Sequence, residues 1–220
     1  PGTKFVTLGG MIAADIHGKN HHIEGNFSRY VEWIDVLNSD GNIKRCSRSE
    51  NSELFEWTMG SMGLTGIIVK AAFKLRKIET AWIKLKKITV NSLDEAISIF
   101  ESYNNSTYSV AWIDCLQKKE FGRSIIMLGE HAKIEDLDEK KKQFPLNSPR
   151  KFSVPIPFNL PSWFLNSWSV KLFNSIYVWK NKKDLGEKLV DWNSYFYPLD
   201  KVFGWNKIYG RRGFAQFQCV

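Results

Sequence analysis

The chain has 220 residues, of which 43% are hydrophobic and 25% charged, and this describes a globular protein with room for one large domain or two small ones. Its net charge of +8 suits anionic partners such as nucleic acid, a phosphate-bearing substrate or a membrane surface, and an ordinary basic protein explains it equally well. The chain contains no apolar run near the ~18 residues of a membrane-spanning helix. Its three cysteines lack a CxxC pairing, which argues against a disulfide framework and a zinc ribbon.

The first predicted feature is a cofactor site within residues 5–25. We expect a short strand over residues 5–8, a turn at Gly9 and Gly10, and a helix over residues 11–15 that leads into a polar loop. A strand, a diglycine and a helix start together can bring backbone N–H groups close to a phosphate. The loop, residues 16–22, holds three of the four histidines. We expect these side chains to face a ligand, with His17 nearest because it directly follows the helix.

Two other interpretations of the histidines stay open. His17 and His21 have the i, i+4 spacing of a metal-binding pair on a helix, but Gly18 interrupts the helix and spacing supplies no third ligand. A purely structural role for His17, His21 and His22 is the second alternative.

The rest of the first region predicts a small α+β lobe. Alternation over residues 30–37, a turn at Asp40 and Gly41, and a return over residues 42–46 predict a β-hairpin. A short helix is expected over residues 52–59, followed by a glycine turn over residues 60–66 and a strand over residues 67–77. That strand is expected to point five residues inward: Ile67, Val69, Ala71, Phe73 and Leu75. We place a domain boundary near Ile78.

The following region predicts a second α+β domain with an antiparallel sheet. Strands are expected over residues 82–88, 108–115 and 124–128, and a charged helix over residues 135–142. Ser92 and Glu95 form a capping box at the start of an amphipathic helix. The apolar side of this helix is expected to comprise Leu93, Ala96, Ile97 and Phe100.

Residues 144–183 are rich in proline and aromatic residues and end in a lysine cluster. Trp163, Phe164 and Trp168 beside lysines are typical of a segment that lies in a membrane interface. The alternative is a helix packed on its own sheet.

Several known sequence motifs are absent, which excludes some functions but does not identify the ligand. Neither glycine segment is a Rossmann GxGxxG or a P-loop, so the spacing indicates a nucleotide-type cofactor and not which one. No GxSxG or Cys/His arrangement predicts acyl transfer, and no nucleic-acid-binding signature occurs. We therefore expect neither nucleic acid nor a metal as a ligand.

Three segments resemble the FAD-binding domain of the vanillyl-alcohol-oxidase type: TLGG at 7–10, DIHGKNHH at 15–22 and GLTGII at 63–68. Shorter matches continue with AWID at 111–114, YPLD at 197–200, WN at 205–206 and GF at 213–214. Within this type the chain is most similar to flavin enzymes that oxidise a polyprenylphosphoryl ribose. The resemblance implies a partial FAD-binding domain over residues 1–77 and a substrate-binding domain over residues 78–220 that is incomplete at its C-terminus.

The resemblance also implies which residues form the site. The expected FAD-binding residues are Gly2, Thr7, Leu8, Gly9, Gly10, His17, Gly18, Lys19, Asn20 and Ile68. The expected sugar-binding residues are Trp112, Gln216 and Gln218. His17 is the one flavin-adjacent catalytic candidate on this chain. In such enzymes the 2-hydroxyl carbon of the ribose gives hydride to flavin N5 while a base takes the hydroxyl proton.

Further expectations concern the whole protein. The resemblance implies a role in cell-wall arabinan precursor synthesis, a reductase partner that completes the epimerisation, and a peripheral position on the cytoplasmic or periplasmic face of the inner membrane. It places a first phosphate-binding loop before Pro1, and a candidate base lysine and an active-site cysteine after Val220. The 220 residues alone are then expected to retain little or no FAD and to be inactive. Two alternatives stay open, a sugar or alditol oxidase with a soluble substrate and a non-catalytic basic binding module.

Overall fold

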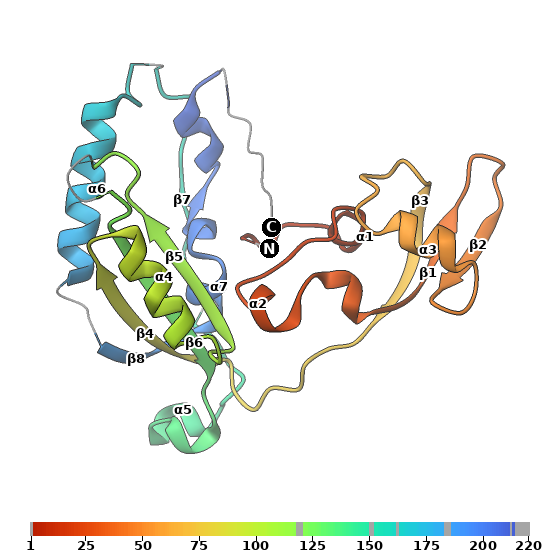
Figure 1. Cartoon of the computed structure of the whole chain (residues 1–220), viewed down its shortest axis with the longest axis horizontal. Helices are drawn as coiled ribbons and strands as arrows, with labels where there is room; N and C mark the ends of the chain where they lie inside the picture. The colour runs from red at the N-terminus through yellow and green to blue at the C-terminus, as the bar shows by residue number, and fades with distance from the viewer. Residues whose placement is uncertain are drawn as a thin grey trace. The chain divides into compact units, whose positions relative to one another are not determined.

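The chain divides into two compact units, Pro1–Ile78 and Glu79–Val220 (Figure 1). This computed structural model describes residues 2–117, 121–149, 152–161, 163–182, 186–211 and 213. Each unit contains its own antiparallel sheet with helices, which confirms the predicted α+β class.

The first unit is built on a three-stranded sheet in the order β2-β1-β3. Its elements are α1 (Leu8–Ala13), α2 (His21–Glu24), η1 (Phe27–Tyr30), β1 (Val31–Leu37), β2 (Ile43–Ser47), α3 (Ser52–Thr58) and β3 (Ile67–Phe73). The predicted hairpin is confirmed, because β1 and β2 pair antiparallel and Gly41 N donates to the carbonyl oxygen of Asn38 at 3.1 Å. The core consists of Ile12, Val31, Ile34, Val36, Cys46 and Phe55.

The strand predicted over residues 5–8 is wrong. The Thr7 hydroxyl accepts a hydrogen bond from Gly10 N at 3.2 Å, and the Thr7 carbonyl accepts one from Met11 N at 3.0 Å. Thr7 is therefore an N-cap, and α1 begins at Leu8 with Gly9 and Gly10 in its first turn instead of in a turn before it. The helix also ends earlier than predicted, at Ala13.

The strand predicted over residues 67–77 ends at Phe73, and part of its predicted inward set is exposed. Ile67 is 65% and Leu75 81% exposed, and Val69 is exposed as well. The side chains that do pack on the core are Ile68, Ala71 and Phe73. The register with β1 shifts between Asp35 and Val36, which leaves Val69 as a bulge. An extra residue at a bulge changes the phase of the side-chain alternation, and the sequence pattern contains no sign of it.

The second unit is built on a four-stranded sheet in the order β5-β6-β4-β8. Its regular elements up to α5 are β4 (Trp82–Val90), α4 (Leu93–Ser102), β5 (Tyr108–Ile113), β6 (Ser124–His131), η2 (Ile134–Asp136) and α5 (Glu139–Lys142). Those that follow are β7 (Val154–Pro155), α6 (Ser167–Lys182), β8 (Gly186–Asp191), α7 (Trp192–Phe196), η3 (Pro198–Lys201), β9 (Val202–Phe203) and η4 (Trp205–Tyr209). The three predicted strands are confirmed as β4, β5 and β6, whereas β8 was not predicted.

Both faces of this sheet carry an apolar cluster. One cluster joins the sheet to α4 and contains Val90, Ala96, Ile126 and Leu128. The other joins it to α7 and contains Ile83, Leu85, Tyr108 and Tyr195. In Figure 1, α4 lies in front of the strands.

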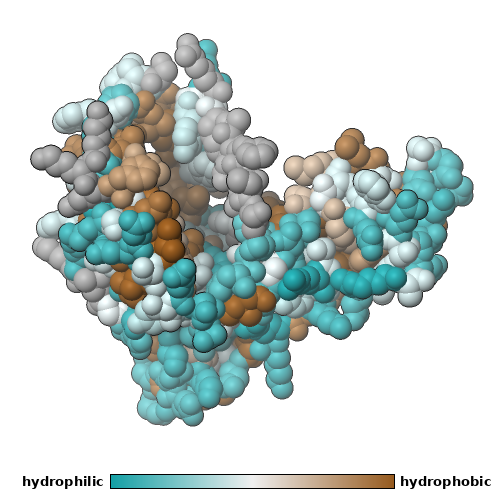
Figure 2. Space-filling view, viewed as in Figure 1, coloured by the Kyte–Doolittle hydropathy of each residue, from teal (hydrophilic) through white to brown (hydrophobic). Residues whose placement is uncertain are grey.

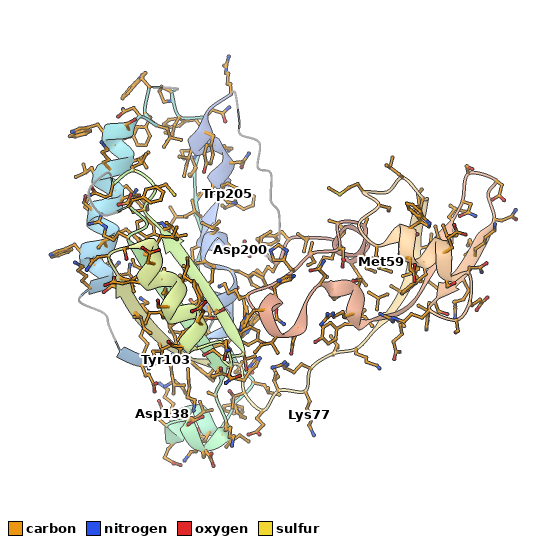
Figure 3. All side chains as sticks on the ribbon, in the orientation of Figure 1. Met59, Lys77, Tyr103, Asp138, Asp200 and Trp205 are labelled. Carbon is orange, nitrogen blue, oxygen red and sulfur yellow. The ribbon has the colours of Figure 1, made fainter. Side chains whose placement is uncertain are left out.

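Two details of the predicted helices are wrong. Leu93 and Ile97 are exposed, and α4 instead packs through Ala96, Ile99 and Phe100. Tyr103, which is labelled in Figure 3, directly follows the helix. Its hydroxyl accepts a hydrogen bond from Lys86 Nζ at 2.9 Å. The charged segment over residues 135–142 is two short helices, η2 and α5, instead of one.

Helix α6 packs on its own unit, but through a largely polar side instead of its aromatic one. Its buried residues are Asn174, Val178 and Asn181, while Trp168 and Ile176 are exposed. Figure 2 shows hydrophobic residues at the surface of this unit among hydrophilic ones. In the described part of the chain, no helix combines the length and apolar character needed to cross a bilayer.

Candidate functional site

The two glycine segments that the sequence singled out meet in the first unit. Gly60 N donates to the carbonyl oxygen of Ile12 at 3.3 Å, and Met62 N donates to that of Ala13 at 2.8 Å. Gly9 lies against Ile68, since a Cβ added at Gly9 would stand 3.8 Å from both Ile68 Cβ and Ile68 O. The turn over residues 60–66 is therefore bonded to the end of α1, and β3 supports the start of α1.

The loop over residues 16–22 is held at its start by Asp15. The Asp15 carboxylate accepts hydrogen bonds from Asn26 Nδ2 at 3.0 Å, Ser28 N at 2.9 Å and Ser28 Oγ at 3.1 Å. Phe27 N donates to the carbonyl oxygen of Ile16 at 2.9 Å. Asp15 has a φ of 39°, a conformation that Asp adopts more readily than most residues. These bonds tie the segment before His17 to the segment after the loop.

The other end of the loop is held by Glu24. The Glu24 carboxylate accepts a hydrogen bond from Asn20 Nδ2 and forms an ion pair with Arg76. The Asn20 side chain also accounts for the glycine at position 18, because a Cβ there would lie 2.7 Å from Asn20 Oδ1. Gly18 and Asn20 are thus brought together, and a larger residue at position 18 would displace the Asn20 amide.

Burial affects the protonation of two basic residues in the loop, His17 and Lys19. Partial burial lowers the pKa of His17, and the positive charge of His21 lowers it further. The two imidazole rings meet edge to face with centroids 5.3 Å apart. Burial also lowers the pKa of Lys19 to about 8. Near neutral pH the loop thus holds an imidazole that favours its neutral form and an ammonium group that loses its proton more readily than usual.

A hollow of about 390 Å³ lies beside this loop in the first unit. Its lining residues are His21, His22, Ile23, Gly25, Asn26, Ser28 and Arg29. Among the residues described here, no cluster of three or more His, Cys, Asp or Glu side chains could hold a metal ion.

Sequence reasoning missed the residues that support the loop. Asp15 and Glu24 flank the predicted site, and neither these two residues nor Arg76 was assigned a role. The hollow contains Arg29, which was also missed. A carboxylate directly beside a histidine-rich loop was the one signal that could have indicated Asp15.

The other predicted site residues lie outside the loop over residues 16–22. Gly2 is exposed, and a Cβ there would have nothing within 4 Å. Trp112 lies on β5 in the second unit, half-buried, with its ring centroid 4.8 Å from that of Tyr177. Gln216 and Gln218 lie outside the described residues.

Comparison with known proteins finds a relative that matches along the whole chain. Decaprenylphosphoryl-β-D-ribose oxidase from Mycolicibacterium smegmatis is 37% identical over 227 residues, which cover all of this chain and 48% of that protein. The chain is a relative of decaprenylphosphoryl-β-D-ribose oxidase. It spans about half the length of this curated relative. No family model matches the chain.

Shorter similarities extend to other oxidoreductases. Cytokinin dehydrogenase 5 from Arabidopsis thaliana is 33% identical over 84 residues, which cover 37% of this chain and 15% of that protein. D-arabinono-1,4-lactone oxidase from Debaryomyces hansenii is 29% identical over 108 residues, or 49% of this chain and 17% of that protein. Unlike these two, the match to decaprenylphosphoryl-β-D-ribose oxidase covers the whole chain.

Proposed function

We propose that the protein to which this chain belongs is an FAD-dependent oxidoreductase that oxidises the 2-hydroxyl of a polyprenylphosphoryl ribose. The observation that carries this proposal is the 37% identity to decaprenylphosphoryl-β-D-ribose oxidase along the whole chain. We assign the first unit to the second lobe of an FAD-binding domain and the second unit to a substrate-binding domain. The product then serves cell-wall arabinan synthesis, with a reductase partner completing the epimerisation.

The residues of the first unit fit a phosphate-bearing, flat cofactor. The partly buried Lys19 is a poorer cation in the flavin-free chain, so an anionic group beside it would restore its charged form. Gly18 leaves room for the Asn20 amide, whose position Glu24 fixes. Bound FAD would accept a hydride from the substrate.

Each chain residue would then have a limited task. Lys19 and the backbone N–H of Gly9 would bind the cofactor, and Ile68 would contact it at the adenosine end. Gly10 would lie beside the cofactor, with its own N–H bonded to Thr7. His17, in its favoured neutral form, would lie beside the flavin without adding a charge there. Thr7, Leu8, Gly2, Gly18 and Asn20 complete the proposed cofactor set. Trp112, Gln216 and Gln218 are proposed to bind the sugar.

The proposal is tested in the full-length protein with His17→Gln and with Lys19→Met. We expect both variants to lower FAD occupancy, measured by the flavin absorbance of the purified protein, and to lower turnover of polyprenylphosphoryl ribose. Lys70→Met, an exposed lysine on β3, is the matched control for Lys19. Unchanged flavin content and turnover in both variants would contradict the roles assigned to His17 and Lys19. A wild-type full-length protein without flavin and without turnover would instead favour the non-catalytic basic module.

A second candidate is a flavin oxidase of soluble sugars, because half of the chain is also similar to D-arabinono-1,4-lactone oxidase. The two candidates differ in the substrate they select. Equal turnover of free ribose and of polyprenylphosphoryl ribose by the full-length protein would contradict the lipid-linked assignment. Because that substrate is anchored in a bilayer, we propose that the protein acts as a peripheral protein on the cytoplasmic or periplasmic face of the inner membrane.

A further inference from the structure

Helix α6 is oriented with its polar side toward its own unit. Asn174 Nδ2 donates to Asp114 Oδ1 at 2.7 Å, and Asn181 Oδ1 accepts from Lys87 Nζ at 2.8 Å. Val178 lies between these two asparagines on the same side and is buried. The spacing of 174, 178 and 181 is one helical face. Its hydrogen bonds, the buried Val178 and the ring contact of Tyr177 with Trp112 hold the helix to the sheet.

The opposite face of α6 is apolar and exposed. Trp168 is 74% exposed, and Leu172, Ile176 and Trp179 are 48%, 54% and 60% exposed. The spacing of 168, 172, 176 and 179 aligns these side chains in one stripe along the helix. A helix that only packed on its sheet would show the reverse arrangement, with the apolar stripe inward.

Lysines border this stripe. At 100° per residue, Lys171 and Lys182 lie along one edge of it and Lys180 along the other, and all three are exposed. The described residues 163–182 contain these three lysines and no Asp or Glu, so the helix carries only positive side-chain charges. The surface around the stripe therefore matches an anionic partner.

We propose that the outer face of α6 binds to the surface of an anionic lipid bilayer, with the helix axis parallel to the membrane plane. An apolar stripe with Trp residues, bordered by lysines, is the pattern of helices that insert one side into the headgroup region. The tryptophan rings would settle at the interface while the lysines contact lipid phosphates. The proposal rests on the proposed function for its purpose, because the bilayer holds the polyprenyl chain of the substrate.

The test uses the full-length protein and flotation with vesicles of phosphatidylcholine containing 30% phosphatidylglycerol. The variant Trp168→Gln, Leu172→Gln, Ile176→Gln removes most of the stripe. We expect its affinity for these vesicles to fall about tenfold or more, since it loses the apolar area that would be buried. The control Ile43→Gln, Trp57→Gln, Leu75→Gln replaces the same residue types at exposed positions of the first unit and is expected to bind like wild type.

A second variant tests the charges. Replacing Lys171, Lys180 and Lys182 by Gln is expected to weaken binding about fivefold per lysine and to remove the preference for anionic over pure phosphatidylcholine vesicles. This variant leaves the stripe and the contacts of Asn174 and Asn181 in place. Circular dichroism and flavin absorbance of each variant report whether the fold is retained.

Two results would overturn the proposal. One is a wild-type protein that retains flavin yet does not float with the anionic vesicles. The other is an α6 variant that binds vesicles like wild type, or that only changes the oligomeric state measured by sedimentation, which would assign the stripe to a second copy. Turnover of detergent-dispersed polyprenylphosphoryl ribose is measured separately. Loss of vesicle binding with normal turnover would concern α6 alone, whereas absent turnover would contradict the proposed function.

Discussion

Gly9 of α1 lies directly against Ile68 of β3, at 3.8 Å from an added Cβ to both the side chain and the carbonyl oxygen of Ile68. Because Gly9 has no side chain, the start of α1 can lie close to β3. An alanine methyl fits at ordinary contact distance, whereas a longer side chain must push α1 away from β3.

We therefore expect Gly9→Ala to change the free energy of unfolding by no more than about 1 kcal/mol. Gly9→Leu is expected to destabilise the protein by about 1–3 kcal/mol and to lower flavin occupancy. Urea denaturation and flavin absorbance of the full-length protein measure both effects. Equal behaviour of the two variants would show that the approach of α1 to β3 does not depend on this glycine.

A side chain at Gly66 would collide with neighbouring atoms, whereas one at the nearby Gly63 would not. Its φ is +139°, and a Cβ would stand 2.6 Å from the carbonyl oxygen of Leu37, whereas Gly63 has a φ of +88° and open space around it. Gly66→Ala is expected to cost about 3 kcal/mol or more, and Gly63→Ala about 1–2 kcal/mol. The difference in urea midpoint between the two variants is the measurement, and a smaller effect at Gly66 would contradict the prediction.

Asp15 is expected to position the histidine-rich loop. Asp15→Asn keeps a residue that tolerates the φ of 39° but removes the charge and one acceptor oxygen. We expect a loss of about 1–3 kcal/mol in the free energy of unfolding and a lower flavin occupancy. Asp40→Asn, which alters a carboxylate that accepts hydrogen bonds from Asn42 within the exposed hairpin turn, is the control. A loss of unfolding free energy at Asp15 no larger than that at Asp40 would contradict a positioning role for Asp15.

Lys19 is expected to make stability depend on pH. Burial lowers its pKa to about 8 from the usual 10.5, so between these values the unfolded chain holds a proton that the folded chain has released. The free energy of unfolding therefore rises with pH in this window, by up to about 1.4 kcal/mol per pH unit. Below pH 8 the cost of burying the charged lysine is fully present.

The measurement compares flavin-free wild type with Lys19→Met by urea denaturation from pH 7 to pH 10. At pH 7 the variant is expected to be the more stable of the two, and its advantage is expected to shrink as the pH rises above 8. Lys70→Met, at an exposed position of the same unit, is the control for the loss of a lysine side chain. A constant difference for Lys19 would contradict the assigned burial.

Local patterns sufficed to predict much of the fold. The hairpin of β1 and β2, helix α3, and strands β4, β5 and β6 follow from alternation, turn residues and capping, which depend on near neighbours in the sequence. The predicted N-terminal strand failed because the capping hydroxyl of Thr7 outweighs the β propensity of residues 5–8. The inward set of β3 failed because a bulge at Val69 depends on pairing with β1, which is distant in sequence.

By itself the sequence determined the α+β class, the two glycine segments and the histidine-rich loop, because these depend on residue type and spacing. Only the tertiary structure decided that Gly9 meets Ile68, that Asp15 and Glu24 hold the loop at its two ends, and that α6 points its apolar stripe outward. Side-chain periodicity shows that a helix has an apolar side. Which side faces the protein is decided by the partners it finds there, and for α6 these are Asp114 and Lys87.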